Sequence, residues 1–424
     1  MKTGSRLFVT WALALLTVGV TLPLPANAAP GLKVLAPIET LPAPADPAPS
    51  PPPGEGPRAF LGTLLAVDGR TIIAGVASGH AAYAYRESSP AHWRYEGMLL
   101  GPDGSVFFSK ACIRDGVALV SGSIVNGAGF VYVFRRVGRE WQFVQKLLEP
   151  EPEADTMPAY FGSQMAFGGD IAVVSNFTDR NSFGAVYVYR KTSNGRFTYE
   201  EKLSADDGSE FDSFGWSVAT DGEQILVGSQ GSGGAAYVFR RVHGVWKQEQ
   251  KLTSPASPAS PALGEDFGFS VAISGRTAVI ASPDYGYVGQ PLKNGAAFVF
   301  VQRGNTWGVE QTLVDPLPSG GLFGQAVALQ GGQILVSAWG GTDASLPERV
   351  YFFDRMHRAE WTPTLVMSEG NGGNSFGYEL ALSDSVLITS ALALPAENPA
   401  FQGQVFVYEL PRSRDDGHAR VLEH

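Results

Sequence analysis

The 424-residue chain contains a single cysteine, Cys112, so no disulfide can form within it. Its stability must therefore come from the burial of a hydrophobic core, which a chain of this length can supply. Cys112 lies in an apolar, strand-like stretch, and we expect a buried small hydrophobic side chain rather than a reactive thiol.

Basic residues are also few, since 31 Lys and Arg stand against 41 Asp and Glu, a formal net charge of −10. Phosphate groups of nucleic acids are bound by clustered Lys and Arg, so this composition argues against a nucleic-acid partner. The six histidines show no metal-ligand spacing. Neither a Gly-x-Ser-x-Gly motif nor a phosphate-binding loop occurs in the chain, so no catalytic residue can be named.

Long apolar runs are rare, and the clearest one, Leu7–Leu22, follows the basic residues Lys2 and Arg6. A small-x-small site, Ala26–Ala28, comes shortly after it, as in a secretory signal peptide over residues 1–28. The alternative is a membrane anchor, for which the run is short against a hydrocarbon core of ~30 Å. We expect an exported monomer that is secreted, periplasmic or associated with the cell surface, with no membrane span after cleavage.

Glycine, in contrast, is abundant, and one glycine-containing pattern recurs along the chain. In its fullest form, Phe267–Ala281, a Phe-Gly pair leads into an apolar run, a tight turn and a second apolar run. The copies begin 46 to 56 residues apart, and a period near fifty indicates a solenoid or a propeller. The copies start at Leu61-Gly62, Phe107-Phe108, Phe161-Gly162, Phe214-Gly215, Phe267-Gly268, Phe323-Gly324 and Phe376-Gly377.

Each copy carries four short strand signals, except that the last copy lacks its fourth. The third is the most regular, as in Val186–Tyr189, and the fourth runs from an aromatic residue to a Leu six positions later, as in Trp246–Leu252. This arrangement predicts an all-β fold, a seven-bladed β-propeller of four-stranded antiparallel blades, over residues 60–410. Two stacked β-sandwiches are the alternative, but they would not repeat one pattern at one period.

The missing fourth strand of the seventh copy must be supplied from elsewhere if the ring closes. Residues 29–36 are the predicted ring-closing strand, because Leu32–Pro37 resembles Lys146–Pro150 at the end of a fourth strand. Closure would remove a free sheet edge; the alternative is that this segment merely begins a disordered linker. Residues 37–59, rich in Pro and Ala, are predicted to be an extended linker, and residues 411–424 a polar tail.

Three features of the fifth copy resemble the FG-GAP repeat: Phe267-Gly268, Ile280–Pro283 and Gly295–Ala297. That repeat builds the propeller of integrin α subunits and of many bacterial exported proteins, and the resemblance extends over all seven copies, weakest in the first two. Integrin-type copies often hold calcium in an Asp-rich loop between the first two strands. Here that connection is a minimal turn, such as Asp221-Gly222 or Ser274-Gly275, so we expect no integrin-type calcium site and no cofactor.

Strand alternation sorts the connections between two faces of the predicted ring. The connections from strand two to strand three and from blade to blade emerge together, and we call this side the long-loop face. The two other sets form the short-loop face, where arginines gather, whereas acidic residues gather on the long loops. This separation is either functional or the ordinary charge of solvated turns. Binding residues concentrate on loops above a rigid scaffold, so the long-loop face is the expected binding surface.

Two groups of residues on the long-loop face are candidate sites. Aromatic side chains beside a carboxylate suit sugars or peptides, although the same side chains could simply fill the base of their loops. Closely spaced carboxylates could hold a divalent cation, although a solvated acidic turn is the commoner arrangement. The aromatic group is Asp284, Tyr285, Tyr287 and Trp339, and the acidic group is Asp206, Asp207, Glu210 and Asp212.

From the sequence we expect an exported, non-catalytic propeller that binds a protein or a glycan through its long-loop face. One alternative is a propeller hydrolase or lyase that uses carboxylates at the mouth of the central channel. Another is a purely structural surface module. Convergent carboxylates with raised pKa values would favour the enzyme, and an aromatic groove without them would favour binding.

Overall fold

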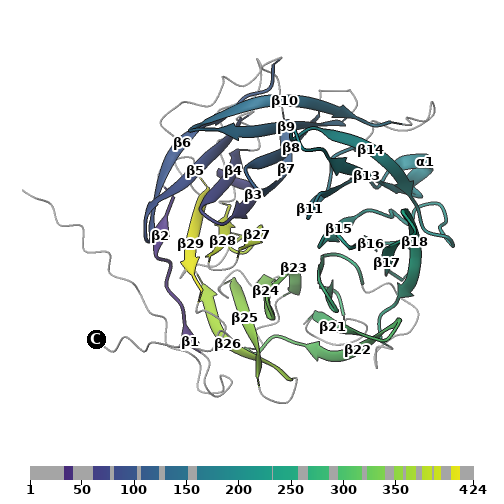
Figure 1. The fold of residues 1–424 in the computed structure, drawn as a ribbon. Helices are drawn as coiled ribbons and strands as arrows, with labels where there is room; N and C mark the ends of the chain where they lie inside the picture. Colours follow the sequence, from purple (N-terminus) through teal and green to yellow (C-terminus); the bar gives the residue numbers. More distant parts are fainter. Residues whose placement is uncertain are drawn as a thin grey trace, which may run out of the picture.

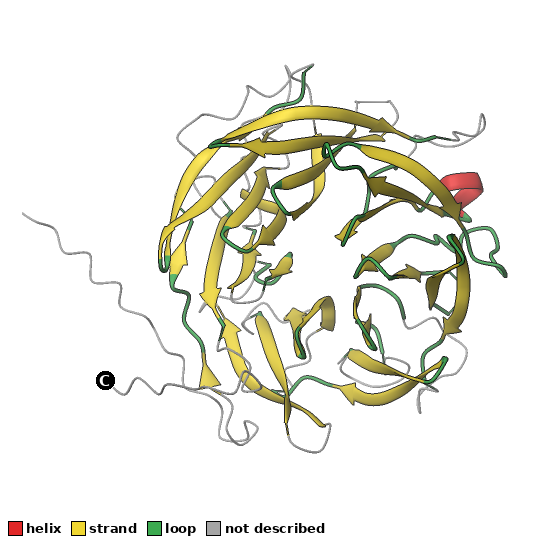
Figure 2. Cartoon of the chain, viewed as in Figure 1, coloured by secondary structure: helices red, strands yellow, loops and turns green. Residues whose placement is uncertain are grey.

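The described part of the chain forms a closed ring of seven β-sheets around a central axis, which confirms the predicted seven-bladed propeller (Figure 1). Nearly all of it is strand, and four-stranded antiparallel sheets follow one another in chain order (Figure 2). The computed structural model describes residues 33–41, 61–76, 81–102, 107–123, 129–150, 160–231, 233–255, 266–285, 295–317, 322–339, 348–356, 360–368, 375–383, 386–392 and 403–410.

Blades one to five are each continuous in sequence, and the first strand of each blade lies nearest the axis (Figure 1). The strands of the first three blades are β3 (Leu61–Asp68), β4 (Thr71–Val76), β5 (Ala81–Ser89), β6 (His92–Leu99); β7 (Phe107–Arg114), β8 (Val117–Ser123), β9 (Gly129–Val137), β10 (Glu140–Leu148); and β11 (Met165–Gly168), β12 (Ile171–Asn176), β13 (Ala185–Lys191), β14 (Phe197–Leu203). Blades four and five are β15 (Ser217–Thr220), β16 (Gln224–Ser229), β17 (Ala235–Val242), β18 (Val245–Leu252); and β19 (Val271–Ser274), β20 (Thr277–Ser282), β21 (Ala296–Arg303), β22 (Thr306–Leu313).

Blades six and seven include strands from the N-terminal segment. Blade six consists of β23 (Leu322–Gln330), β24 (Gln333–Trp339), β25 (Arg349–Met356), β26 (Glu360–Ser368) and an added β1 (Lys33–Val34), and blade seven of β27 (Leu380–Leu382), β28 (Val386–Ala391), β29 (Gln404–Glu409) and β2 (Glu39–Thr40). One helical turn, α1 (Asp179–Ser182), occurs among the described residues, in the long loop of blade three.

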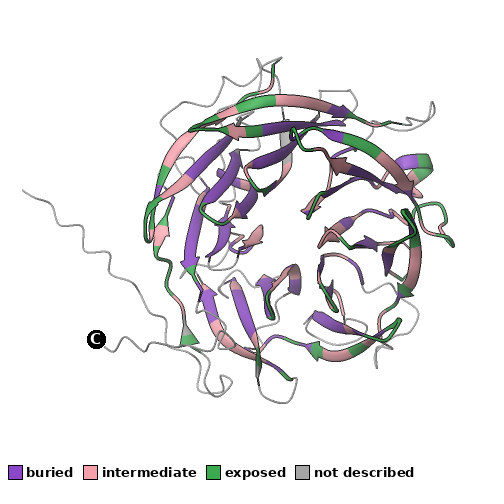
Figure 3. Cartoon of the chain, in the orientation of Figure 1, coloured by how far each residue is buried: buried purple, intermediate pink, exposed green. Residues whose placement is uncertain are grey.

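The second and third strands of each blade are buried on both faces, because neighbouring blades cover them (Figure 3). Every residue of β12, β16 and β28 is buried, which explains why these strands are continuous apolar runs rather than alternating ones. The outer strands are covered only in part, as in β14, where the buried ends Phe197 and Leu203 flank more exposed residues. The core of the molecule is therefore a set of layers between blades, not one central cluster.

The Phe-Gly pair of each blade packs against the blade before it. Gly268 has φ +93°, and a Cβ there would lie 2.3 Å from the carbonyl oxygen of Ala235 in blade four, so only glycine fits. Gly234 approaches the carbonyl oxygen of Phe267 just as closely, at 2.4 Å from its own ideal Cβ position. The same approach recurs between Gly184 and Phe214. The Phe-Gly and Gly-Ala elements of the repeat are thus the two sides of one contact between blades.

A side-chain clamp joins the outer strands of neighbouring blades. The Oε1 of Gln250 accepts a hydrogen bond from the backbone N–H of Trp307 at 2.8 Å, and its Nε2 donates to the carbonyl oxygen of Trp307 at 2.9 Å. In each case an amide or carboxylate two residues before the last Leu of a fourth strand holds the first aromatic of the next fourth strand. The clamps are Glu39–Trp93, Gln145–Phe197, Glu201–Trp246, Gln250–Trp307 and Gln311–Trp361.

The N-terminal segment does close the ring, but with different residues from those predicted. Lys33–Val34 pairs in parallel with β26 of blade six. Glu39–Thr40, which the sequence placed in the linker, is the strand that pairs antiparallel with β29 and completes blade seven. Pro37 separates the two strands, because a residue without an N–H cannot continue a ladder. The buried Leu41 then takes the place of the final Leu of the other fourth strands.

The predicted signal peptide (1–28), most of the predicted linker and the polar tail (411–424) lie outside the described residues. Within the part that is described, no helix has the length and apolar character to cross a membrane.

Candidate functional site

The long-loop face is the side on which each inner strand begins. The opposite connections, between the first and second strands, are two-residue turns in blades one, two, three, five and six, such as Gly69-Arg70 and Gly275-Arg276, and blade four has three residues there. Carboxylates at these turns accept hydrogen bonds from the backbone of the next blade. Asp68 accepts from the N–H of Asp115 at 2.7 Å, and Asp221 accepts from the N–H of Gly275 at 2.9 Å. These hydrogen bonds join neighbouring blades.

At the inner rim of the long-loop face, four aromatic rings from blades three to five form a continuous series. Tyr160 stacks on Phe177 with ring centroids 5.3 Å apart and planes 23° apart. Phe177 lies 5.3 Å from Trp216, and Trp216 lies 6.1 Å from Phe269. These separations are those of interacting aromatic pairs, so the four side chains form one surface across three blades.

Blades six and seven add a second stacked pair at the same end of their strands. Trp339, at the end of β24, and Tyr378, just before β27, stack with centroids 5.9 Å apart and planes 13° apart. The indole N–H of Trp339 is buried and has no hydrogen-bond partner among the described residues. We refer to the six residues together as the aromatic arc: Tyr160, Phe177, Trp216, Phe269, Trp339 and Tyr378.

The rings of the aromatic arc remain accessible although they touch one another. Tyr160 is 53% exposed and Tyr378 is 42% exposed, and the other four are half-buried. Large apolar side chains that are both clustered and exposed mark interaction surfaces more often than singly scattered ones do.

The position of three of these rings follows from the Phe-Gly motif. Trp216, Phe269 and Tyr378 each come directly after the Gly, whose left-handed backbone leads the chain out of the inter-blade core. Phe214 is 1% exposed, for example, whereas Trp216 is half-buried. The first two positions of the Phe-Gly-x triplet therefore serve packing, and the third is available at the rim.

The structure does not bring the residues of the predicted aromatic site together. Trp339 belongs to the aromatic arc. Tyr285 packs its ring edge-on against the buried Phe298, 5.1 Å between centroids, and so fills the base of its loop. Asp284 is half-buried beside it, and Tyr287 lies outside the described residues. The other five members of the aromatic arc were missed, although the third position of the triplet is a signal that could have found three of them.

The acidic group in the loop between β14 and β15 does not converge on one point. Asp207 forms an ion pair with Lys251, 2.5 Å between Oδ2 and Nζ, and the hydrogen bond from Lys251 lowers the pKa of the Asp207 carboxyl. Asp212 instead accepts from the N–H of Ser209 at 2.7 Å. Asp206 and Glu210 are exposed. Across the described residues, no three His, Cys, Asp or Glu side chains are grouped as metal ligands.

Other carboxylates on the long-loop face are also engaged in contacts within the fold. Glu149 accepts from the hydroxyl of Tyr187 at 2.5 Å and from the amide of Asn176 at 3.0 Å. Asp315 accepts from the hydroxyl of Tyr351 at 2.6 Å. Each of these pairs joins a loop to the following blade. Several of the acidic residues that the sequence places on the long-loop face therefore stabilise the fold.

Two carboxylates lie near the inner strands, where a propeller hydrolase or lyase would place its catalytic residues. Glu379, next to Tyr378, forms an ion pair with Lys110 of blade two. Burial raises the pKa of Glu348, and this side chain accepts a hydrogen bond from the backbone N–H of Phe376. Both groups therefore have partners within the fold that account for their positions.

Cys112 is half-buried on β7 and packs against the core between blades two and three. Desolvation raises the pKa of its thiol to about 12, so the thiol stays protonated at neutral pH. This fits the structural role expected for the side chain.

A comparison with protein families matches the FG-GAP repeat at residues 197–239 and 246–300. These two stretches are similar to the FG-GAP repeat. Each matched unit starts on the fourth strand of one blade and ends on the third strand of the next, so it spans the contact between blades described above.

Among solved structures, a chain in "Crystal Structure of Mitotic Checkpoint Complex" is 11% identical, with a TM-score of 0.53 over 96% of this chain and 99% of that one. A protein from Lactobacillus plantarum, also 11% identical, has a TM-score of 0.48 over 73% of this chain and 88% of that one. At such identity the first similarity shows the propeller fold alone. No curated protein sequence matches the chain.

Proposed function

We propose that this FG-GAP propeller is a non-catalytic binding module that holds a glycan on the aromatic arc. The observation that carries the proposal is the continuous contact from Tyr160 through Phe177 and Trp216 to Phe269. No packing requirement of the repeat explains the rings of Trp216 and Phe269, because the third triplet position is Ser163 in blade three and Gln325 in blade six.

The chemistry of the rings favours a sugar. Pyranose rings present faces of C–H groups that pack on aromatic rings, while their hydroxyls need only a few polar partners. A ring series that spans three blades suits several sugar units in a row. A peptide ligand is the competing outcome that the experiment below distinguishes.

The N-terminal sequence supports the proposal that the protein acts outside the cytoplasm. Residues 1–28 have the features of a signal peptide, and FG-GAP repeats are found in extracellular and surface proteins. We therefore propose that the ligand is an extracellular or cell-surface glycan.

An array of neutral glycans and unrelated peptides, probed with the mature protein, tests the proposal. We expect binding to at least one neutral glycan, unchanged by a calcium chelator. Trp216→Ala should weaken that binding about tenfold or more, since an aromatic contact and its burial contribute ~1–2 kcal/mol. Tyr199→Ala, a comparably exposed tyrosine on β14 outside the aromatic arc, is the matched control. Binding to peptides alone, or binding that Trp216→Ala leaves intact, would refute the proposal.

A further inference from the structure

The arginines of the short-loop face differ between blades in whether they form ion pairs. In blade three, the Nε of Arg190 on the third strand lies 2.9 Å from a carboxylate oxygen of Glu200 on the fourth. In blade four the equivalent pair, Arg240 and Glu249, is 3.4 Å apart. In these two blades the fourth strand neutralises the arginine of its own blade, whereas in blade one Arg86 donates to the hydroxyl of Thr71 and Glu96 pairs with Arg136 of blade two.

Blade two breaks this pattern. Arg135 has the same register position as Arg190 and Arg240, but the residue that corresponds to Glu200 is Val144. No described residue places a carboxylate within ion-pair distance of Arg135, whose side chain donates instead to a backbone carbonyl. The position of Val144 holds a glutamate in four other blades: Glu96, Glu200, Glu249 and Glu310.

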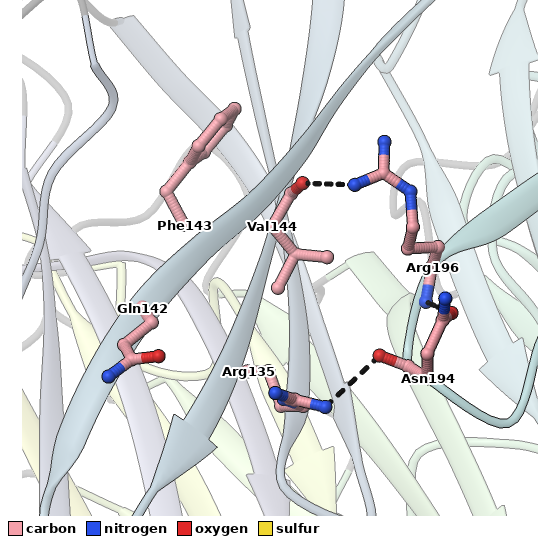
Figure 4. Close-up of a pocket in the computed structure, with 6 residues that line it drawn as sticks. All are labelled: Arg135, Gln142, Phe143, Val144, Asn194 and Arg196. Atoms are coloured by element: carbon pink, nitrogen blue, oxygen red, sulfur yellow. Dashed lines mark hydrogen bonds between the residues drawn. The ribbon is translucent and has the colours of Figure 1, made fainter.

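The unpaired Arg135 lines a pocket of about 310 Å³ between blades two and three (Figure 4). Arg196, at the edge of β14, supplies a second guanidinium, and the two arginines reach across the boundary in opposite directions. Arg135 donates to the carbonyl oxygen of Asn194 at 3.1 Å, and Arg196 donates to that of Val144 at 3.0 Å. The lining residues are Arg135, Gln142, Phe143, Val144, Asn194 and Arg196.

The hairpin that carries Arg196 is held in place by its own hydrogen bonds. The Oδ1 of Asn194 accepts from the hydroxyl of Thr192 at 2.6 Å and from the backbone N–H of Arg196 at 3.1 Å. Gly195 has φ +80°, and a Cβ there would lie 3.2 Å from the Cδ of Arg135, so glycine lets the turn close against the arginine stem. The two cations are therefore positioned before any ligand arrives, which lowers the cost of binding.

The nearest carboxylates of the repeat pattern are already engaged elsewhere. Glu96 pairs with Arg136, and Glu200 pairs with both Arg190 and Arg241. A guanidinium offers five N–H donors, and Arg135 and Arg196 each use one of them, on a backbone carbonyl. The remaining donors of both arginines carry positive charge into a pocket that has no Asp or Glu among its described lining residues.

We propose that this pocket, hereafter the blade 2–3 pocket, binds the carboxylate or sulfate of an anionic saccharide unit. Arginine recognises planar or tetrahedral oxyanions through paired N–H donors. The side chain of Gln142, which also lines the pocket, offers amide groups for hydroxyls. The volume lies at the lower end of ligand sites and suits one sugar residue.

The decisive variant is Val144→Glu, which restores the glutamate of the other blades. Its carboxylate should pair with Arg135, as Glu200 pairs with Arg190, and so neutralise the blade 2–3 pocket, at the loss of the contacts that Val144 makes with the core between blades two and three. A second variant, Arg135→Gln/Arg196→Gln, removes both guanidiniums. Arg139→Gln changes the charge of an exposed arginine in the β9–β10 turn, outside the lining residues, and is the matched control.

Titration of the mature protein with glucuronate, inorganic sulfate and neutral methyl glucoside, followed by NMR of the arginine Nε–H signals, measures binding. We expect glucuronate and sulfate to shift the Arg135 and Arg196 signals with millimolar affinity, and methyl glucoside not to. Sulfate alone would assign a plain oxyanion site and contradict the saccharide. Val144→Glu and the double variant should each weaken binding about tenfold or more, while Arg139→Gln leaves it within twofold. Unshifted signals, or equal binding by Val144→Glu, would overturn the proposal.

Discussion

The first and third positions of one triplet, Phe214 and Trp216, differ in burial. Phe214 is buried between blades three and four, with its ring 5.5 Å from that of Tyr237. Trp216, two residues later, lies at the rim and contacts rings of blades three and five. Gly215, with φ +95°, separates the two. The Phe and Gly of the triplet pack the blades against one another, and the variable third residue lies on the accessible rim. Mutations within one triplet should therefore separate stability from binding.

The largest loss of stability should follow from Phe214→Ala. Removal of a fully buried phenylalanine leaves a cavity between two blades and costs about 3–5 kcal/mol in the free energy of unfolding. Urea unfolding followed by tryptophan fluorescence measures this. A loss no greater than that of Trp216→Ala would show that the two positions are not distinct after all.

Gly268→Ala should come next, with a cost of about 2 kcal/mol or more. The alanine would have to adopt φ +93° and would place its Cβ 2.3 Å from the carbonyl oxygen of Ala235, and left-handed backbone alone costs ~1–2 kcal/mol. Gly97→Ala is the control, because a Cβ at Gly97 meets no atom within 4 Å. Equal melting temperatures for the two variants would contradict the packing role of the Phe-Gly glycine.

The clamps between outer strands should contribute less. Gln311→Ala leaves the backbone N–H and carbonyl of Trp361 without their partner, at a cost of about 1–3 kcal/mol in the free energy of unfolding.

The reverse experiment adds a clamp where one is missing, since blade one has Gly97 at the clamp position and lacks the contact. Gly97→Gln should gain about 0.5–1.5 kcal/mol by holding Trp141, as measured by chemical unfolding; a destabilised variant would argue against the equivalence of the junctions.

The smallest effect concerns Cys112. Because burial raises the pKa of its thiol to about 12, the reactive thiolate is scarce at pH 8, and alkylation of the folded protein should be much slower than alkylation of the urea-unfolded chain. Mass spectrometry after iodoacetamide treatment distinguishes the two states. Rapid modification of the folded protein would show that the thiol is accessible and ionised.

The fold could be predicted from the sequence because its signal is repeated: seven copies of one pattern at one period leave few architectures. The closing strand was placed wrongly because a two-residue pairing has little signal of its own. Glu39-Thr40-Leu41 matches Gln311-Thr312-Leu313, but the comparison becomes convincing only once the clamp of Gln311 on Trp361 is known. In the same way Val144 is an unremarkable residue until the register shows that it stands where other blades have glutamate.

The candidate site could be predicted only in part, for a related reason. Trp339 was found because it stands where the second strand of blade six runs into a long loop. Tyr160 and Phe177 meet through the pairing of the first two strands of blade three, and Trp216 joins them only when blade four lies beside blade three. Tyr285 also follows the second strand of its blade, yet its ring packs against the buried Phe298. Whether an aromatic side chain fills a loop or faces a ligand depends on contacts between blades, which local sequence does not encode.

The most direct test of the account compares Trp216→Ala with Phe214→Ala by measuring, for each variant, both glycan binding on the array and the free energy of unfolding. The account predicts that Trp216→Ala loses binding about tenfold or more and changes stability by less than about 1 kcal/mol. Phe214→Ala should show the opposite order, a large loss of stability with binding retained by the fraction that remains folded. Retained binding by folded Trp216→Ala would contradict the central claim that the third position of the triplet carries the function.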